Sequence, residues 1–250
     1  LNPDHLERHG SFKNYAEAKF KIIKSQSKKD FAFIESKNNF LKELIKNNQI
    51  KSKIIKIDYL KSQKYYRKIN NIYFNNSSNK KNLSFVFSIA KILKLNLKTV
   101  INTANKFKGL NYRQQIIYNS KKLLIINDSK STSFSSTVPL LESYQNIYWI
   151  LGGLAKKGDK LSLNKNYISN IKAYVYGKDR NFFISSLPNQ ISYKYSSTLK
   201  KIMKNLNNDI KKDNTKKVIL FSPCAASFDQ FKNFEERGKF FNDIIVLMLK

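Results

Sequence analysis

Short apolar runs alternate with polar turns through the second half of the chain. Four runs rich in Ile, Val and Tyr occupy residues 123–126, 147–151, 173–176 and 218–221. Unbroken apolar runs of this length are typical of strands that are buried on both faces of a parallel sheet. We therefore expect the second half to be an α/β domain with a mostly parallel sheet.

The first half mixes helical and strand-like patterns. Apolar residues recur at helical spacing in residues 14–24, 83–95 and 97–107, and strand-like runs occupy residues 31–34 and 54–59.

Local signals refine the elements of the first half. In the first predicted helix, Tyr15, Ala18 and residues 20–23 are available for a buried face. Residues 70–82 are rich in Asn, Ser and Lys and predict a surface loop or hairpin tip. Gly109 follows the third helical stretch and fits its C-cap, so a boundary is expected near residues 109–113.

Three polar motifs follow predicted strands. They are NDSKST at residues 127–132, GGLAKKGD at 152–159 and SPCAASFDQF at 222–231. In parallel α/β sheets, ligands bind outside the carboxyl ends of the strands, so these motifs are expected to form the site. The acid, hydroxyls and amine of the first motif, followed by a helix, suit an anion. Asp128 also fits the N-cap of that helix, the commonest role of Asp at such a place.

Aromatic residues in the last motif predict core packing. Phe228, Phe231 and Phe234 stand at helical spacing, and Cys224 precedes a possible helix N-terminus where its pKa could fall. No histidine follows Cys224 to activate it as a nucleophile, so it is expected to be a small buried residue.

The charge balance changes this picture little. The net charge of +30 and the pI near 10.0 are typical of nucleic-acid binders. However, lysine supplies nearly all of it, spread along the whole chain, and arginine, the better reader of bases and phosphates, is scarce. Lys, Asn and Ile share A/T-rich codons, so we expect a solvated lysine surface and no specific nucleic-acid partner.

Other classes are excluded on composition. No apolar run approaches the roughly 20 residues that cross a bilayer, and no signal peptide is visible, so a cytoplasmic protein without a membrane partner is expected. One cysteine and two histidines indicate neither a disulfide nor a zinc site.

Two residues near the start carry candidate chemistry. The opening NPDHLERHGSFKNYAEAK places His5 in a turn and Lys19 on the first helix. A neutral imidazole can ligate a metal, whereas an ordinary ammonium cannot. On these residues alone, His5 is a loop histidine and Lys19 a surface lysine. Arg113 is equally a surface arginine or a group that grips a terminal phosphate.

The opening, NDSKST, the LGG segment and SPCAASFDQFKNFEERG occur in the same order and at similar spacing as in the Mur ligases. The chain resembles most closely the members that add D-glutamate, although the opening is shared with folylpolyglutamate synthases. The resemblance covers essentially all 250 residues. It implies the C-terminal part of a central ATP-binding domain over residues 1–112, followed by a Rossmann-like α/β domain over residues 113–250.

The resemblance also implies a reaction. ATP would phosphorylate the alanyl carboxylate of UDP-N-acetylmuramoyl-L-alanine, and the amine of D-glutamate would attack the acyl phosphate. The implied cofactors are ATP and Mg²⁺, and the implied protein is a cytoplasmic monomer of peptidoglycan precursor synthesis.

Site residues follow from the resemblance position by position. His5 and a carbamylated Lys19 would bind Mg²⁺, since a carbamate supplies the oxygen ligands that magnesium prefers. Charge alone does not distinguish Lys156 from its neighbour Lys157 as the lysine of the D-glutamate site. The implied nucleotide-binding residues are Asn82, Arg113, Asp128 and Lys130, and the implied D-glutamate-binding residues are Thr132, Lys156, Ser227, Phe228 and the backbone of Phe234.

The sequence departs from the family pattern in several places. Lys81 and Phe85 replace a histidine and an asparagine of the family's nucleotide motif, and Tyr112 replaces a histidine beside Arg113. No Gly-rich phosphate loop ending in Lys and Ser or Thr occurs, and the chain begins at Leu1. We therefore expect a fragment that cannot turn over by itself. Alternatives are a Mur-type ligase that adds diaminopimelate or lysine, a non-catalytic α/β ligand-binding module, and a basic nucleic-acid binder.

Overall fold

The computed structural model describes residues 6–249, and the chain divides into two compact units. The first unit takes residues 1–70 and 79–105, and the second takes residues 71–78 and 106–250. The boundary expected near residues 109–113 lies close to the last crossing between the units, but the short excursion at residues 71–78 was not foreseen. The division into domains at residue 112 stays a prediction.

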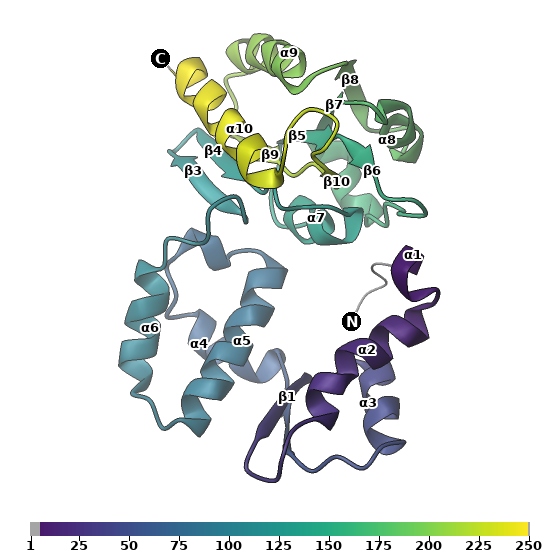
Figure 1. Ribbon diagram of the computed structural model, residues 1–250. Helices are drawn as coiled ribbons and strands as arrows, with labels where there is room; N and C mark the ends of the chain where they lie inside the picture. Colours follow the sequence, from purple (N-terminus) through teal and green to yellow (C-terminus); the bar gives the residue numbers. More distant parts are fainter. Residues whose placement is uncertain (1–5, 250) are drawn as a thin grey trace. The chain divides into compact units, whose positions relative to one another are not determined.

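The first unit contains a small parallel pair of strands packed against helices (Figure 1). Phe20 and Ile23 from the first long helix pack against Ala32 and Ile34 of the first strand. This helix begins after Ser11, whose Oγ accepts a hydrogen bond from Asn14 N at 3.1 Å, a standard N-cap. The elements are α1 (Leu6–His9), α2 (Phe12–Lys24), β1 (Phe31–Glu35), α3 (Asn39–Lys46), β2 (Lys53–Ile57), η1 (Leu60–Ser62), α4 (Gln63–Tyr66), α5 (Ser77–Ile92) and α6 (Leu97–Lys106).

The predicted helices and strands of the first half are confirmed, but the buried face of α2 differs in part from the prediction. Tyr15, Ala16, Phe20 and Ile23 form the buried face of α2, whereas Ala18 is exposed and Ile22 is 71% exposed.

The loop predicted over residues 70–82 is wrong. A 3-10 helix occupies Ile72–Phe74 and α5 begins at Ser77. Asn76 is only 1% exposed, and its Nδ2 donates hydrogen bonds to Tyr73 O and Gln114 Oε1. Asparagine favours turns partly because it bonds to nearby backbone, and here that capacity is used inside the fold.

Gly109 is not the C-cap of the preceding helix, because α6 already ends at Lys106. Its φ of +79° suits a turn, and a Cβ at this position would lie 2.9 Å from the ring of Tyr73.

The second unit is built on a six-stranded sheet with the order β3-β4-β9-β5-β7-β8. All neighbouring pairs are parallel except β3 with β4. The four predicted strands are confirmed, so the expected mostly parallel α/β fold is observed. The elements are η2 (Ile72–Phe74), β3 (Gln115–Asn119), β4 (Leu123–Asn127), α7 (Phe134–Leu141), β5 (Ile147–Gly152), β6 (Leu154–Ala155), η3 (Lys165–Asn170), β7 (Ile171–Tyr176), α8 (Arg180–Ser186), β8 (Ser192–Ser196), α9 (Leu199–Lys212), β9 (Lys217–Phe221), β10 (Ala225–Ala226) and α10 (Phe234–Leu249).

Both faces of this sheet carry a hydrophobic core, which explains the unbroken apolar runs. Trp149 and Leu151 of β5 pack in the core cluster that includes residues of α7 and α8, and Tyr148 and Ile150 pack in the cluster that includes residues of α9 and α10. Figure 1 shows these four helices around the sheet. Each fully buried large apolar side chain contributes about 1.5–3 kcal/mol, so the sheet is a rigid base for the loops at its edge. None of the described helices is long and apolar enough to cross a bilayer.

Candidate functional site

The three polar motifs meet at one edge of the sheet of the second unit. Strands β4, β9 and β5 are neighbours, so their carboxyl ends lie side by side. Backbone hydrogen bonds join the loops: Asp128 N donates to Phe221 O at 2.7 Å, and Gly152 N donates to Pro223 O at 2.9 Å. The convergence expected from the sequence is therefore confirmed.

Asp128 lies buried where the first and third motifs touch. Its Oδ1 accepts a hydrogen bond from Gln114 N at 3.1 Å, and its Oδ2 accepts one from Ser222 Oγ at 2.9 Å. The N-cap reading of Asp128 is wrong, because the N-cap of α7 is Ser133.

The buried setting of Asp128 changes its acidity. Burial raises the pKa of this carboxyl to about 7, although the bonds from Ser222 and Gln114 and the charges of Arg113 and Arg237 oppose the rise. Asp128 is therefore a carboxyl that titrates near neutral pH inside the site.

A chain of hydroxyl groups continues from Asp128 into the start of α7. Ser222 Oγ lies 2.6 Å from Thr137 Oγ1, which lies 2.7 Å from Ser131 Oγ, and Ser131 Oγ lies 2.8 Å from Ser136 Oγ. Hydroxyls can donate or accept, so this chain satisfies Asp128 in either protonation state. It also ties the β4 and β9 loops to one helix.

Cys224 belongs to the same buried cluster and has no features of a nucleophile. Its Sγ donates to Thr137 Oγ1 at 3.0 Å, and burial raises the pKa of the thiol far above its ordinary value. The expected small buried residue is confirmed. The helix start near it is not, since α10 begins only at Phe234.

Lys130 is anchored against the start of α10. Its Nζ lies 3.9 Å from the centroid of the Phe234 ring, close enough for a cation–π interaction. Its backbone N donates to Tyr112 O at 3.0 Å, and the neighbouring Ser129 Oγ donates to Phe234 O at 2.8 Å. Two predicted site residues from distant motifs, Lys130 and Phe234, are thereby brought together.

Arg113 and Tyr112 lie in a tight turn before β3. Arg113 is exposed and forms an isolated bridge with Leu110, while Tyr112 has a φ of +61°. The ring of Tyr112 packs on Gly238, where a Cβ would come within 2.3 Å of the ring. Tyr112, which replaces the family's histidine at this position, therefore packs against α10.

The second motif contacts the first through an acid that the sequence did not single out. Asp159 Oδ2 accepts a hydrogen bond from Phe134 N, the first residue of α7, at 2.7 Å. This bond brings the turn that carries Lys156 to the loop that carries Thr132. Burial lowers the pKa of Lys156, opposed by Asp159. Lys156 is half-buried and Lys157 is exposed.

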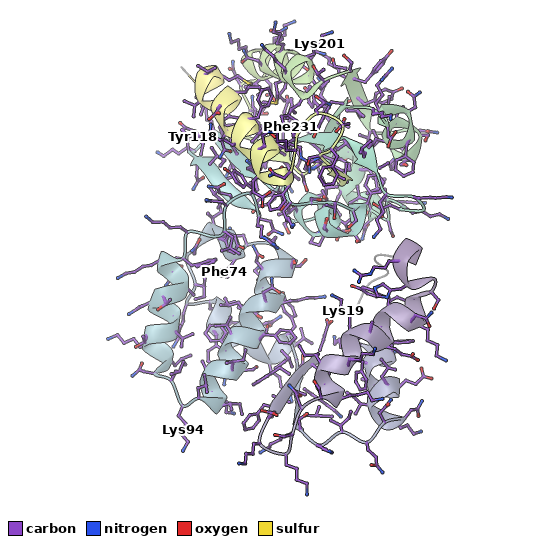
Figure 2. The ribbon with its side chains drawn as sticks, in the orientation of Figure 1. Lys19, Phe74, Lys94, Tyr118, Lys201 and Phe231 are labelled. Atoms are coloured by element: carbon purple, nitrogen blue, oxygen red, sulfur yellow. The ribbon has the colours of Figure 1, made fainter. Side chains whose placement is uncertain are left out.

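The third motif places its aromatics differently from the prediction. Residues 227–233 form a turn and bend segment rather than a helix, and Phe228 is 70% exposed. Phe231 packs against the core beneath α10 (Figure 2). Ser227 is buried and follows β10, which pairs antiparallel with β6. Of the three aromatics, only Phe231 joins a core cluster.

The remaining predicted residues belong to the first unit. Lys19 is exposed on α2, with its Nζ 5.6 Å from the ring centroid of Tyr15 (Figure 2). Asn82 is exposed on α5, and the neighbouring Lys81 pairs with Glu35 at 3.4 Å. His5 lies outside the described residues. Within residues 6–249, no group of three or more His, Cys, Asp or Glu is placed to hold a metal ion.

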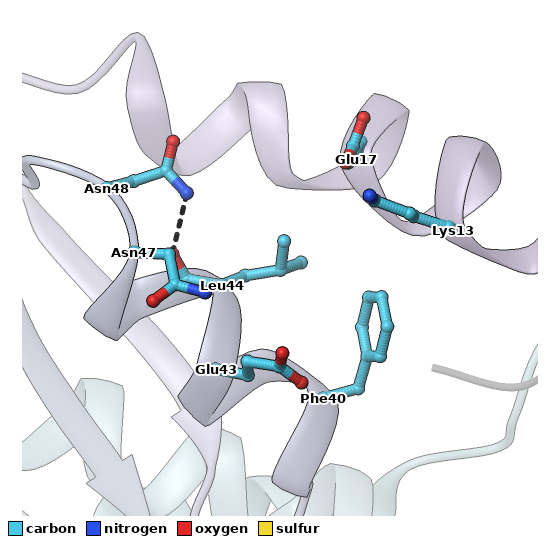
Figure 3. Close-up of a pocket in the computed structure, with 7 residues that line it drawn as sticks. All are labelled: Lys13, Glu17, Phe40, Glu43, Leu44, Asn47 and Asn48. Atoms are coloured by element: carbon cyan, nitrogen blue, oxygen red, sulfur yellow. Dashed lines mark hydrogen bonds between the residues drawn. The ribbon is translucent and has the colours of Figure 1, made fainter.

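A surface hollow of about 380 Å³ between α2 and α3 contains none of the predicted site residues (Figure 3). Lys13 and Glu17 line it from α2. The other lining residues, from α3 and the turn after it, are Phe40, Glu43, Leu44, Asn47 and Asn48.

The sequence analysis did not single out Arg237, which is 1% exposed and bonds to the loops after β4 and β9. Its charged neighbours make it look like a surface residue. The available signal was its spacing from Phe241 and Ile245, four and eight residues later on the same helix face, both of which are buried.

Comparisons with known proteins agree with this architecture. The Mur ligase middle domain matches residues 1–136. A UDP-N-acetylmuramoylalanine–D-glutamate ligase of Rickettsia bellii is 32% identical over 263 residues, covering 96% of this chain and 58% of that protein. The protein of the same name from Wolbachia sp. subsp. Brugia malayi is 32% identical over 253 residues, covering 95% and 50%. The chain thus spans about half the length of these curated relatives.

Solved structures share the fold at low sequence identity. The MurF ligase from Thermotoga maritima in complex with ADP has a TM-score of 0.67 at 14% identity, covering 97% of this chain and 60% of that chain. MurF from Acinetobacter baumannii also has a TM-score of 0.67, at 15% identity, covering 100% and 58%. Because the family match takes in more than half of the chain, this chain belongs to the Mur ligase family.

Proposed function

We propose that the protein carrying this chain is an ATP-dependent ligase that joins D-glutamate to UDP-N-acetylmuramoyl-L-alanine in the bacterial cytoplasm. The curated relatives bear the name of this activity. The observation that carries the proposal is that the loops after β4, β5 and β9, which carry Lys130, Lys156 and Ser227, adjoin one another at the carboxyl ends of these strands.

The nucleotide side of the proposed site takes Lys130, Asp128 and Arg113. Lys130 is held by Phe234 and by the carbonyl of Tyr112, so its ammonium is positioned before a phosphate arrives. Arg113 is exposed and free to form paired hydrogen bonds with a terminal phosphate. Asp128 acts indirectly: its carboxyl accepts hydrogen bonds from Gln114 N and Ser222 Oγ and so holds these two residues in place. Asn82, on α5, stays a proposed nucleotide-binding residue.

The D-glutamate side divides into two ends, which suits a substrate with two carboxylates. Thr132 and Lys156 lie on the segments that the bond from Phe134 N to Asp159 joins. Ser227 and the backbone of Phe234 flank the turn at residues 227–233, with exposed Phe228 between them. Fixed groups that hold each carboxylate would orient the amine for attack on the acyl phosphate.

For magnesium, the proposed ligands are His5 and Lys19. The exposed amine of Lys19 is accessible for carbamylation, which would turn it into an oxygen ligand. Bound magnesium would offset phosphate charge; the roles of the second unit's residues given above do not depend on it.

The test is phosphate release by the protein translated from the complete reading frame. With UDP-N-acetylmuramoyl-L-alanine and ATP, release should depend on D-glutamate and not on meso-diaminopimelate or L-lysine. Turnover with one of those other amino acids instead would overturn the substrate assignment. D-glutamate binding without turnover would favour a binding module.

A matched pair of variants tests the assignment of Lys156. Lys156→Met should raise the KM for D-glutamate at least about tenfold, since a carboxylate loses its charged partner. Lys157→Met removes the same charge from an exposed neighbour and should leave the KM within about twofold. The reverse pattern would place Lys157 in the site.

A further inference from the structure

Arg237 bonds to both loops that carry the proposed site residues. Its Nη2 donates to Ser129 O at 2.6 Å and to Ala225 O at 2.9 Å, and its Nε donates to Ser129 Oγ at 3.1 Å. Ser129 belongs to the β4 loop and Ala225 to the segment after β9. One guanidinium therefore bridges the main chains of two loops that are about 100 residues apart in sequence.

These contacts act directly on neighbouring site residues. Ser129 precedes Lys130, and its Oγ also donates to the carbonyl of Phe234. Ala225 pairs with Ala155 in the short ladder that leads to Lys156. A shorter or differently shaped side chain at position 237 would therefore alter the spacing between the groups proposed to hold the substrate.

The charge of Arg237 has no direct counter-ion. No carboxylate of residues 6–249 lies within salt-bridge distance of it. Arg237 also lies beside the buried hydroxyl of Tyr176, where its charge and a side-chain hydrogen bond oppose the rise in the pKa of that phenol, and Asp229 acts on the same hydroxyl.

A buried charge is costly to desolvate, and an apolar residue of similar volume often stabilises a core better. The buried guanidinium therefore calls for a role besides packing. The substrate proposed for this site is an anion with two carboxylates, which a guanidinium just beneath the loops would favour.

We propose that Arg237 is a positioning residue of the D-glutamate site, which sets the spacing of the β4 and β9 loops and supplies positive potential for the dicarboxylate. This inference rests on the proposed function. Arg237 reaches the substrate through the loops it holds.

The experiment compares D-glutamate binding by the 250-residue chain and three variants, using isothermal titration calorimetry. Arg237→Met removes the charge and both bridging bonds, and Arg237→Lys keeps the charge but not the paired geometry. Lys239→Met is the matched control, because Lys239 lies on the exposed face of the same helix with its side chain 72% exposed.

The Kd for D-glutamate should rise at least about tenfold in Arg237→Met, rise less in Arg237→Lys, and stay within twofold in Lys239→Met. In the complete protein, the same variants should raise the KM for D-glutamate with kcat within about threefold. A merely structural Arg237 would lower the unfolding temperature and leave both constants unchanged.

The outcomes separate the two proposals. If the unchanged chain binds no D-glutamate and the complete protein does not use it, the proposed function fails and the inference fails with it. If the unchanged chain binds and Arg237→Met binds equally well, only the inference is overturned. If Arg237→Met does not fold, Arg237→Lys decides: a Kd raised threefold or more supports the inference, and an unchanged Kd overturns it.

Discussion

Replacement of Asp128 by Asn should remove a pH dependence from the stability of the second unit. The pKa of Asp128 in the folded chain is about 7, against an ordinary value of 3.8, because the carboxyl is buried. Between these two values, the folded chain keeps a proton that the unfolded chain has released. Stability must therefore fall as the pH rises through this window.

The size of the effect follows from the interval. The interval between the two pKa values is a little over three pH units, and each unit is worth about 1.4 kcal/mol. The unfolding free energy of the wild-type chain should therefore fall by about 4 kcal/mol between pH 4 and pH 8 because of this group. Asp128→Asn stays neutral throughout and resembles the protonated carboxyl. Arg113 and Arg237 are the charged groups that act on Asp128, and both are present in the two chains.

Trp149 provides the assay, since it is the single tryptophan of the chain. It is fully buried in β5, and its Nε1 donates to Ser222 O at 2.9 Å, next to the hydroxyl that binds Asp128. Urea unfolding of both chains, followed by tryptophan fluorescence at intervals from pH 4 to pH 8, gives the difference in unfolding free energy. Other titrating groups are common to both chains and cancel.

The two stability curves should converge near pH 4 and separate by about 4 kcal/mol at pH 8, with Asp128→Asn the more stable. A difference that stays constant across the range would refute the reasoning. It would mean that hydrogen bonds and nearby arginines stabilise the carboxylate enough to offset its burial.

Three glycine substitutions test the packing around the site. Gly152→Ala should destabilise by more than about 4 kcal/mol in urea unfolding, since the new Cβ would lie 1.9 Å from the carbonyl oxygen of Tyr176. Gly158 also has a positive φ, of +78°, but nothing lies near its added Cβ, so Gly158→Ala should cost only about 1–2 kcal/mol. Gly238→Ala should cost about 1–3 kcal/mol because of the Tyr112 ring. This penalty should shrink in a Tyr112→Ala background, and an equal penalty in both backgrounds would show that the ring is not the cause.

The buried strands could be predicted because burial on both faces of a sheet leaves an apolar run in the sequence. The edge strands β3 and β8 leave no such run: Ser192, Lys194 and Ser196 alternate with exposed or half-exposed tyrosines. Strand order is also not local information. The sequence places the β4, β5 and β9 motifs far apart, and only the sheet makes β9 the neighbour of both other strands.

Candidate site residues were predicted where chemistry and motif position agreed, as for Lys130 and Ser227. The residues that organise them were missed, because a buried Arg237 or Asp159 looks like any charged surface residue until its partners are known. The core prediction for Phe228 is wrong for the opposite reason: an aromatic at helical spacing predicts core, but the helix begins six residues later and the side chain is exposed. Asn76 and Asn79 likewise predict a loop and are buried.

We propose that the loops after β4, β5 and β9 form one D-glutamate site. The most direct measurement is an NMR titration of the isotope-labelled chain with D-glutamate, and with L-glutamate as control. We expect saturable shifts of the backbone amides of Thr132, Lys156, Ser227 and Phe234 with the D enantiomer and much weaker shifts with the L enantiomer. Equal responses to both enantiomers, or shifts confined to other residues, would contradict it.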